Sequence, residues 1–258
     1  MNLEKINKHI VAWLEAYCGK AGLSGFIVGI SGGIDSAVTS TLCAQTGKKV
    51  MLLNMPIRQT KAEYDRGAEH IEHLKNKFPN VSSFEIDLTT AFEVLEKIYP
   101  EKTVSNRLAM ANTRARLRMT TLYALGQAEN LLVAGTGNKI EDFGIGFYTK
   151  YGDGGVDLSP IADLTKTQVF ALAEHLKIVT SIQKAKPTDG LWEDGRSDED
   201  QIGATYPELE WAMDFNGEEN DLNERQKEVL ALYRKLNRIN QHKMQAIPVC
   251  EIPKEYFL

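Results

Sequence analysis

Apolar residues along this chain follow two spacings, and the two alternate. Short runs rich in apolar or β-branched residues, which are typical of buried strands, come at intervals. We predict strands over residues 25–30, 49–55, 81–88 and 131–135. Between these runs, apolar residues recur every three or four positions, which is the spacing of one helix face.

Helices are predicted where this spacing is combined with start and stop signals. Residues 3–17 predict a first helix that ends at Gly19 or Gly22. Three segments begin with Thr or Asp followed three residues later by Glu, which is typical of a capping box. They are Thr60–Glu63, Thr90–Glu93 and Asp221–Glu224, and the last opens a helix to about Asn240. Further helices are predicted over about 105–127 and 165–176.

Strands that alternate with helices predict an α/β fold with a doubly wound, mostly parallel sheet flanked by helices. We see no internal repeat or linker, so residues 1–258 are expected to form one domain. In such sheets ligands bind beyond the carboxyl ends of the strands. Residues 29–36 and 135–141 both leave a strand at that edge, and we expect them to line one cleft.

Two stretches depart from this pattern. Residues 142–157 contain five glycines, and residues 186–206 combine Pro, Gly and many acids. Long connections of this kind inside a compact chain are usually functional or disordered. We expect both to be loops, and the stretch 142–157 and the acidic residues 191–200 are candidate lids.

Composition narrows the class of protein. The net charge of −5 hides an acidic segment, 189–221, with twelve acids and one base, so the remainder is mildly positive. That excess suits small anions and is too weak to predict nucleic-acid binding. No apolar run reaches the roughly 20 residues that span a bilayer. The three cysteines are scattered, and with no signal-peptide pattern we expect a cytoplasmic protein without membrane contact.

The most informative motif follows the first predicted strand. Residues 26–36 read FIVGISGGIDS, in which an apolar run stops at a glycine pair and a carboxylate precedes a helix-compatible stretch. Glycines allow close approach to the backbone, and the N–H groups of a helix N-terminus favour an anion. The Walker pattern is absent from the sequence, because Gly47-Lys48 is followed by Lys49. The motif therefore predicts a phosphate-binding loop of another kind.

Asp35 makes this loop unusual. A carboxylate next to a polyphosphate is repulsive unless a divalent cation bridges the two, because hard cations take oxygen ligands from both groups. Asp35 therefore favours a metal ligand. The alternative is an ordinary strand-to-helix turn with Asp35 as an acid in the first helical turn.

A second polar loop, GTGNKIE, occupies residues 135–141. Thr136 can donate a hydrogen bond to a phosphate or an adenine edge, and Glu141 offers a second oxygen ligand for an ion held by Asp35. Alternatively, Thr136 caps a helix and Glu141 is a surface acid. The pairing with the first loop favours a shared site.

Charged residues also bracket the glycine-rich stretch. They are Lys150, Asp153, Asp157 and Lys166. A cation near the α- and β-phosphates of a nucleotide stabilises charge that grows during transfer. The alternative is a set of exposed loop charges, and His242-Lys243 alone is typical of a solvated helix end.

These motifs occur in one order that resembles a known family. SGGIDS is similar to the pyrophosphatase loop of the N-type ATP pyrophosphatases, which cleave ATP to AMP and pyrophosphate. Together with ARLRM, GTGNKIEDFGIGFYTKYGDGGVDLSP, DLTKTQVFALA and a late QHK, it makes residues 3–247 resemble the ammonia-dependent NAD+ synthetases. The resemblance implies an adenine nucleotide α-hydrolase-like, Rossmann-like fold and a homodimer with the dinucleotide partly across the subunit interface.

The resemblance also implies roles for individual residues. It assigns ATP binding to Gly29, Ile30, Ser31, Gly32, Gly33, Ile34, Asp35, Ser36, Thr136, Lys166 and Thr188. It assigns Mg2+ to Asp35 and Glu141. It assigns deamido-NAD+ binding to Arg116, Lys150, Asp157, His242 and Lys243. Asp153 matches an acid near the incoming ammonia, so the expected catalytic residues are Asp35, Lys166 and Asp153.

The implied reaction forms an acyl-adenylate from deamido-NAD+ and ATP, releases pyrophosphate, and then lets ammonia displace AMP. Glutamine use needs an additional domain with a catalytic Cys, and a sheet that begins near residue 25 leaves no room for one, so free ammonia is the expected donor. Two other readings stay open: a pyrophosphatase acting on GMP precursors or tRNA, and a nucleotide-binding module without catalysis.

The chain departs from the family in one region. Gly137-Asn138-Lys139 replaces the residues that many members carry in the corresponding GTDHxAE string. From Glu141 to Lys150 the chain is one residue longer than many members. We therefore expect a different local shape between these two residues.

Overall fold

The computed structural model describes residues 1–188 and 197–257. Its centre is a four-stranded sheet, and the four strands pair in parallel in the order β3-β2-β1-β4. The strands are β1 (Gly25–Gly29), β2 (Lys49–Asn54), β3 (Val81–Glu85) and β4 (Leu131–Val133). The α/β fold and the parallel sheet expected from the sequence are confirmed.

Both faces of β1 and β2 are buried, which explains the continuous apolar runs of these two strands, whereas the edge strand β3 is partly exposed. Phe26 and Val28 point to one face, and Ile27 between them points to the other. In β2, Leu52 and Leu53 divide between the same two faces. Because side chains alternate along a strand, an unbroken apolar run supplies two hydrophobic cores at once.

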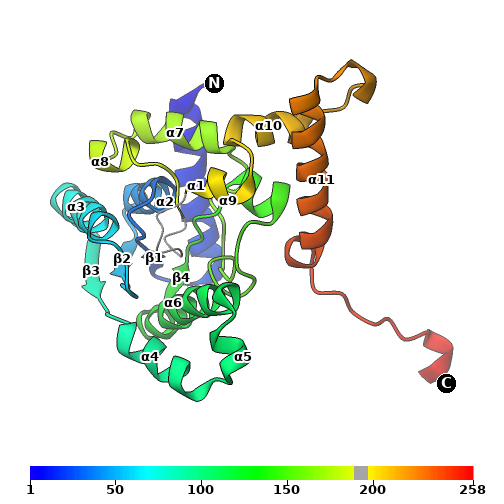
Figure 1. Ribbon diagram of the computed structural model, residues 1–258. Coiled ribbons are helices and arrows are strands. Elements are labelled where there is room, and N and C mark those ends of the chain that lie inside the picture. The colour runs from blue at the N-terminus through cyan, green and yellow to red at the C-terminus, as the bar shows by residue number, and fades with distance from the viewer. Residues whose placement is uncertain (189–196, 258) are drawn as a thin grey trace.

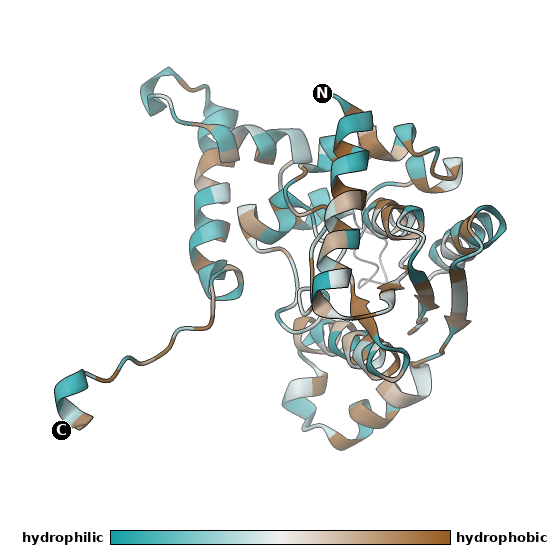
Figure 2. Ribbon diagram, turned by 180° about the vertical axis from the view of Figure 1, so that it is seen from behind, coloured by the Kyte–Doolittle hydropathy of each residue, from teal (hydrophilic) through white to brown (hydrophobic). Residues whose placement is uncertain are grey.

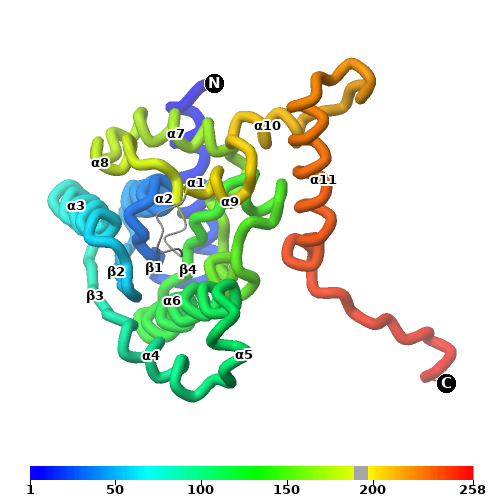
Figure 3. Tube along the Cα trace, viewed as in Figure 1, coloured from blue at the N-terminus to red at the C-terminus, as the bar shows by residue number. Residues whose placement is uncertain are grey.

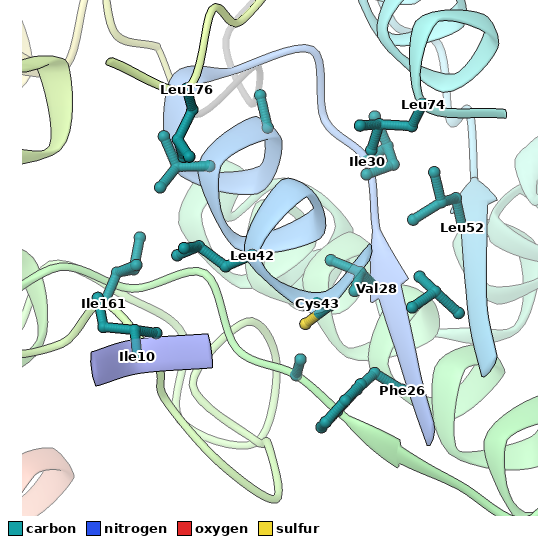
Figure 4. Packing of buried hydrophobic residues seen from close by; sticks show 14 of the residues in the cluster. Ile10, Phe26, Val28, Ile30, Leu42, Cys43, Leu52, Leu74, Ile161 and Leu176 are labelled. Carbon is teal, nitrogen blue, oxygen red and sulfur yellow. The ribbon is translucent and has the colours of Figure 1, made fainter. Parts of the chain in front are cut away.

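Two layers of helices cover these faces (Figure 1). The first core contains residues of α1 (Leu3–Ala21), α2 (Ile34–Gln45), α3 (Lys61–Lys77), α7 (Lys166–His175) and α8 (Thr180–Gln183). Figure 4 shows Leu42 of α2 between Val28 of β1 and Ile161. The second core contains residues of α4 (Thr89–Ile98) and α6 (Arg107–Glu129), and α5 (Glu101–Val104) connects these two helices.

A third hydrophobic cluster lies outside the sheet layers. It joins η1 (Ile140–Ile145), α9 (Asp198–Ile202), α10 (Tyr206–Asp214) and α11 (Glu224–Met244), and η2 (Glu219–Asp221) precedes α11. In the tube view of Figure 3, α11 stands beside the body rather than on the sheet. After α11 the chain runs outward to η3 (Lys254–Phe257).

Local signals predicted some element boundaries and missed others. The capping box of Thr60 and Glu63 opens α3 as expected. The cap expected at Thr90 is wrong, because α4 begins at Thr89 and its N-cap, Leu88, makes no side-chain capping bond. The cap expected at Asp221 is also wrong, because Asn223 and Gln226 form the capping box of α11.

The segment expected to be a loop over 186–206 is non-helical at residues 186–188 and 203–205, but it contains the short helix α9, and its last residue, Tyr206, begins α10. Ser197 and Asp200 form a capping box at the start of α9, and Thr205 and Glu208 form another at α10. These boxes follow the same rule as the one at Thr60, but the density of acids in the sequence obscured them. The lid expected over 191–200 falls largely outside the described residues. Within the described ranges, none of the helices has the length and apolar character needed to cross a membrane.

Candidate active site

The topology brings the two polar loops of the sequence side by side. β1 pairs with β2 on one side and with β4 on the other, so the chain reverses its direction of winding at β1. Ligands of doubly wound sheets bind at this switch point, beyond the carboxyl ends of the two adjoining strands. Residues 29–36 leave β1 there, and residues 135–141 leave β4 there, as expected.

The loop after β1 is held by its own serines. Ser31 Oγ lies 3.1 Å from Ser36 Oγ and accepts a hydrogen bond from the Gly33 N–H at 3.2 Å. Ser36 Oγ also donates to the Gly33 carbonyl at 3.0 Å. Gly32 has φ +80°, and a Cβ there would lie 2.4 Å from the Glu63 carbonyl oxygen, so only glycine fits. The serines thus fix a turn whose tight packing on α3 the sequence alone did not reveal.

This loop ends at the N-terminus of α2. Among the described residues, no side chain caps the helix at Gly33, whose backbone is extended. Uncapped N–H groups and the helix dipole together favour an anion at this position. Residues 29–36 therefore have the arrangement expected of a phosphate-binding loop.

Asn138 links the two loops. Its Nδ2 donates to Asp35 Oδ1 at 3.2 Å, and its Oδ1 accepts from the backbone N–H groups of Ile140 and Glu141 at 3.2 and 3.1 Å. Asn138 is fully buried. Sequence reasoning noted this residue only as a departure from the family, although a buried amide that satisfies both loops is a strong positioning group.

Lys166 lies where the loops converge. Its Nζ is 2.6 Å from Asp35 Oδ2 and 3.0 Å from Glu141 Oε1, and its side chain is 3% exposed. The Tyr206 hydroxyl donates to the same Glu141 oxygen at 2.6 Å, and the Tyr206 ring faces the ammonium at 4.8 Å. The structure thus brings together three residues that the sequence placed in one site, although Asp35 lies more than a hundred residues before the other two. Tyr206 had no sequence signal.

The charges in this cluster do not balance. Burial alone would lower the pKa of Lys166, but the two carboxylates outweigh it and raise that pKa. Burial raises the pKa of Asp35, and the neighbouring charge of Glu141 adds to this effect. For Glu141, the ammonium of Lys166 and the Tyr206 hydroxyl outweigh burial and lower the pKa. One ammonium thus faces two carboxyl groups, and the raised pKa of Asp35 reflects its burial and this shortage of positive charge.

These residues fit a magnesium ion. Two carboxylates that approach one nitrogen within 3.0 Å converge closely enough to share a cation. Oxygen donors with net negative charge suit Mg2+, which binds through one or two carboxylates and completes its shell with water and substrate phosphates. The described residues contain no cluster of three or more His, Cys, Asp or Glu suited to a metal. Two protein ligands, Asp35 and Glu141, are what such a phosphate-dependent site needs.

The segment from Glu141 to Lys150, which is expected to differ from the family, begins in a π-helix, η1 (Ile140–Ile145). A π-turn holds one residue more than an α-turn, and such turns are frequent at functional sites. It places the Asp142 carboxylate where a side chain of residue 137 would be, since a Cβ on Gly137 would lie 2.1 Å from Asp142 Oδ2. Burial and the negative charges of Glu141 and Asp153 raise the pKa of Asp142 to about 8. This arrangement adds an acid to the cluster, and the expected difference in local shape from the family stays a prediction.

The glycine-rich stretch continues from η1 to Asp153. The Asp153 side chain accepts a hydrogen bond from the Thr149 N–H at 3.0 Å, and Thr149 Oγ1 donates to Asn112 at 2.8 Å. Residue 153 is exposed, and the protein groups on one side of its carboxyl desolvate it in part, which raises its pKa. Asp153 therefore lies on a turn that is fixed to α6.

Side chains of α11 hold the carbonyl groups of this stretch. Asn237 Nδ2 donates to the Gly144 carbonyl at 2.7 Å, and Asn240 Nδ2 donates to the Ile145 carbonyl at 2.8 Å. Lys243 Nζ donates to the carbonyls of Gly146 and Tyr148 at 2.6 and 2.8 Å. Residues three apart share a helix face, so one row of α11 contacts one strip of backbone. The two asparagines were not found from the sequence.

Most residues expected to bind deamido-NAD+ gather near the end of α11. Lys150 Nζ donates to the His242 carbonyl, and the Arg116 guanidinium donates to the Lys150 carbonyl at 3.2 and 3.3 Å. With Lys243, these residues form one basic group from α6, the glycine-rich stretch and α11. The structure therefore brings four of the five together.

Asp157 lies elsewhere. Its Oδ1 accepts from the Tyr123 hydroxyl at 3.0 Å and its Oδ2 accepts from the Val133 N–H at 2.8 Å. It borders a cavity of about 480 Å3 that Trp13, Tyr17 and other side chains line. Its part in dinucleotide binding stays a prediction, as do those of Thr136, which follows β4, and Thr188, which follows α8.

Comparison with known proteins gives a consistent result. A profile of the NAD synthase family matches residues 6–247. The NH(3)-dependent NAD(+) synthetase of Alkaliphilus metalliredigens is 39% identical over 257 residues, covering 95% of this chain and 97% of its own. The enzyme of the same name from Methanosarcina mazei is 36% identical, and the match covers 98% of this chain and 100% of the Methanosarcina chain.

Solved structures agree with the fold. The NMN synthetase from Francisella tularensis superposes with a TM-score of 0.84 at 30% identity, covering 98% of this chain and 99% of its own. The NH3-dependent NAD synthetase from Campylobacter jejuni superposes with a TM-score of 0.79 at 25% identity, covering 97% and 100%. The family match spans both polar loops, Lys166 and the end of α11, and so the chain belongs to the NAD synthase family and is an enzyme of the ligase class.

Proposed function

We propose that this protein uses ATP and ammonia to convert the nicotinate carboxylate of deamido-NAD+ to the amide of NAD+, with AMP and pyrophosphate as the other products. The observation that carries the proposal is the contact of Lys166 Nζ with both Asp35 and Glu141. It joins a phosphate-binding loop to two potential metal ligands at the switch point of the sheet. The names of the relatives supply the substrates, since they are NH(3)-dependent NAD(+) synthetases.

The ATP would lie along residues 29–36. The free N–H groups at the N-terminus of α2 favour an anion, so they would hold the departing pyrophosphate. Mg2+ bound by Asp35 and Glu141 would offset negative charge on the phosphates. Lys166 carries its charge at any working pH, because the carboxylates raise its pKa, and it would stabilise the phosphoryl group that is transferred.

Activation of the carboxylate is the purpose of the first step. A carboxylate oxygen of deamido-NAD+ attacks the α-phosphorus, the bond to pyrophosphate breaks, and an acyl-adenylate forms. Ammonia then attacks the carbonyl carbon, the bond to AMP breaks, and the amide remains. The carboxylate oxygen that attacked phosphorus leaves with AMP.

Asp153 is the proposed acceptor of the proton that ammonium must lose before it attacks. Its pKa is raised by desolvation, which brings the carboxyl group closer to the working pH of a general base. The turn that carries it is fixed by Thr149 and, through α11, by Lys243. The acyl-adenylate is open to hydrolysis, and we propose that the glycine-rich stretch 142–157 excludes water when both substrates are bound.

An isotope experiment tests the reaction. The enzyme is incubated with ATP, Mg2+, ammonium and deamido-NAD+ labelled with oxygen-18 in its carboxylate, and products are followed by mass spectrometry. We expect NAD+, pyrophosphate, and AMP that carries one labelled oxygen. Formation of ADP, or AMP without label, would contradict the acyl-adenylate. Asp35→Asn is the control variant, and we expect it to lose product formation while remaining folded.

A second substrate deserves a parallel assay because of the Francisella structure. That protein is an NMN synthetase and superposes with a TM-score of 0.84 over nearly the whole chain. The same chemistry on the nicotinate mononucleotide would give NMN. The ratio of kcat/KM for the two acids decides between the two activities, and we expect the dinucleotide to be preferred.

The remaining expectations belong to the same proposal. We propose a homodimer of single-domain chains in the cytoplasm, with the dinucleotide contacted by Arg116, Lys150, His242 and Lys243. Their backbone contacts give this group a fixed shape before any ligand is present. Arg116→Ala is therefore expected to raise KM for the dinucleotide with little change in KM for ATP.

A further inference from the structure

The segment after α11 has an unusual surface. Residues 246–257, here called the C-terminal arm, are all exposed. Five of them are large and hydrophobic, and their exposed fractions are 67% for Ile247, 80% for Val249, 56% for Ile252, 75% for Tyr256 and 74% for Phe257. Single exposed hydrophobic residues need no explanation, but a contiguous group of this size marks an interaction surface.

The arm extends away from its own subunit. Figures 1 and 2 show, from opposite sides, that it leaves the end of α11 and continues outward from the body. Pro248 and Pro253 restrict φ and keep the preceding residues extended, so the arm is stiff. The eight extended residues before η3 span up to about 28 Å, enough to reach across the surface of a neighbouring molecule. The Tyr256 N–H donates a hydrogen bond to the Pro253 carbonyl. Both residues belong to the arm, so this bond does not attach the arm to the body.

The charge of the arm excludes two kinds of partner. It contains Glu251, Glu255 and a single base, Lys254. Segments that bind anionic lipid or nucleic acid depend on clusters of Lys and Arg. An apolar, nearly neutral segment with two aromatic residues instead matches the core of a protein–protein interface.

We infer that the C-terminal arm docks on a second copy of this chain, and that two copies exchange arms reciprocally. A two-fold exchange covers both arms at once with no further component, which is the closed symmetry common to homodimers. Each body also offers exposed apolar side chains to receive an arm. They are Val94 and Ile98 on α4, Leu108 on α6, and Trp13 and Tyr17 beside the 480 Å3 cavity.

The inference names the segment that holds the proposed homodimer together, and it has a consequence for the site. The arm begins three residues after Lys243, which holds the glycine-rich stretch through the carbonyls of Gly146 and Tyr148. An arm fixed on a second copy would also fix the end of α11. Assembly of the dimer and rigidity of the site would then depend on the same few residues.

Cys250 provides a direct test in the otherwise native chain. It is the exposed cysteine of the arm, whereas Cys18 and Cys43 are buried, so a benzophenone maleimide can be attached to it selectively. Nitrogen-15-labelled and unlabelled chains are mixed, irradiated and digested. We expect crosslinked peptides that join a labelled to an unlabelled chain, and none in Cys250→Ser. Crosslinks confined to one chain, or their absence in the native chain, would overturn the inference.

A truncation gives the second measurement. Removal of residues 246–258 is expected to raise the dimer dissociation constant at least tenfold in sedimentation equilibrium. The paired change Ile252→Ser and Phe257→Ser should have a similar effect, whereas the matched control Lys254→Ser should not. A dimer of unchanged affinity after truncation would refute the arm exchange and leave the proposed reaction and the homodimer intact, because sedimentation requires no activity.

Discussion

Lys166 shows how a buried charge can be retained for a site rather than for stability. Burying an ammonium is costly, and a buried ion pair is often no better than a hydrophobic replacement. Here the ammonium is 3% exposed and serves two carboxylates, Asp35 and Glu141. A cluster built for stability would balance its charges. Two carboxyl groups that share one ammonium make sense if a further cation binds beside them and links them to a polyphosphate.

Replacement of Lys166 by methionine measures how much the buried ammonium contributes to stability. Lys166→Met leaves two buried carboxylates without their ammonium, so we expect a loss of about 3–5 kcal/mol in the free energy of unfolding. Mg2+ should restore part of the loss, because it replaces the missing positive charge. Chemical denaturation at increasing Mg2+ concentration measures both the loss of unfolding free energy and its recovery, and it does not require an active enzyme.

The control is Lys61→Met. Lys61 pairs with Asp65 on the surface with 86% of its side chain exposed, so its change is expected to stay within about 0.5 kcal/mol and to be insensitive to Mg2+. A Lys166→Met variant as stable as the native chain without Mg2+ would show that the carboxylates do not depend on this ammonium.

The burial of His70 makes the free energy of unfolding depend on pH. It is fully buried, its Nε2 lies 2.9 Å from Ser40 Oγ, and burial lowers its pKa from 6.5 to about 4. Between these values the unfolded chain binds the proton and the folded protein does not, so stability falls as pH falls from 6.5 towards 4. The full shift corresponds to roughly 3 kcal/mol.

Thermal or urea unfolding across pH 4–7 tests this contribution. His70→Asn should flatten the slope of stability against pH within that window. His9→Asn, at an exposed position of α1, should leave the slope unchanged. Equal slopes in the native chain and His70→Asn would assign the pH dependence to other groups.

At the scale of elements, the packing of α11 on the glycine-rich stretch depends on Gly146. Its φ is +65°, and a Cβ there would lie 2.4 Å from Asn240 Cβ. Gly22 has a similar φ of +69° with nothing within 4 Å of a built Cβ. Both positions carry the same backbone strain on substitution, but only one carries a clash.

The pair Gly146→Ala and Gly22→Ala therefore separates strain from packing. Gly22→Ala is expected to cost about 1–2 kcal/mol from the left-handed backbone alone. Gly146→Ala should cost about 1–3 kcal/mol more, because α11 must move away. It should also lower kcat/KM for the dinucleotide, since Lys243 and Lys150 move with α11. Equal costs for both variants would mean that α11 yields to the added methyl group.

The same elements show what the sequence could and could not predict. Parallel strands followed from apolar runs, because a strand buried on both faces has a distinctive composition. The convergence of Asp35, Glu141 and Lys166 followed from the topology and the family resemblance. The π-helix at Ile140–Ile145 did not, because a glycine-rich stretch can form a turn, a bulge or a loop equally well. Asn138 and Tyr206 were missed because a buried polar role depends on contacts distant in sequence.

At the scale of the whole molecule, the site depends on a hydrophobic cluster that is separate from the sheet. Glu141 lies on η1, and its partner Tyr206 lies on α10, and both elements pack in the third cluster with α11. Lys166 and Asp35 belong to helices packed on the sheet. The two proposed metal ligands are therefore split between two cores, and we expect metal binding to depend most on the third cluster, which positions Glu141 through Tyr206.

Two leucines of equal burial can separate the cores. Leu209 lies in the third cluster and Leu74 in the cluster on the sheet, and both are 0% exposed. Each Leu→Ala change is expected to cost about 2–5 kcal/mol of unfolding free energy in the region it stabilises. In hydrogen exchange, Leu209→Ala should expose α10, α11 and η1 while the strands stay protected, because local units open independently. Leu74→Ala should instead increase exchange in α3 and the sheet.

The Mg2+ concentration needed for half-maximal activity then distinguishes Leu209→Ala from Leu74→Ala. Leu209→Ala frees Tyr206 and Glu141 from their positions, so half-maximal activity should require severalfold more Mg2+, with near-native rates at saturation. Leu74 lies on α3, remote in the chain from both ligands, and Leu74→Ala should keep the native Mg2+ requirement as long as the chain is folded. If the two variants shift the Mg2+ requirement equally, the third cluster is part of a single cooperative core, and Glu141 is held by the whole fold rather than by the α10–α11 layer.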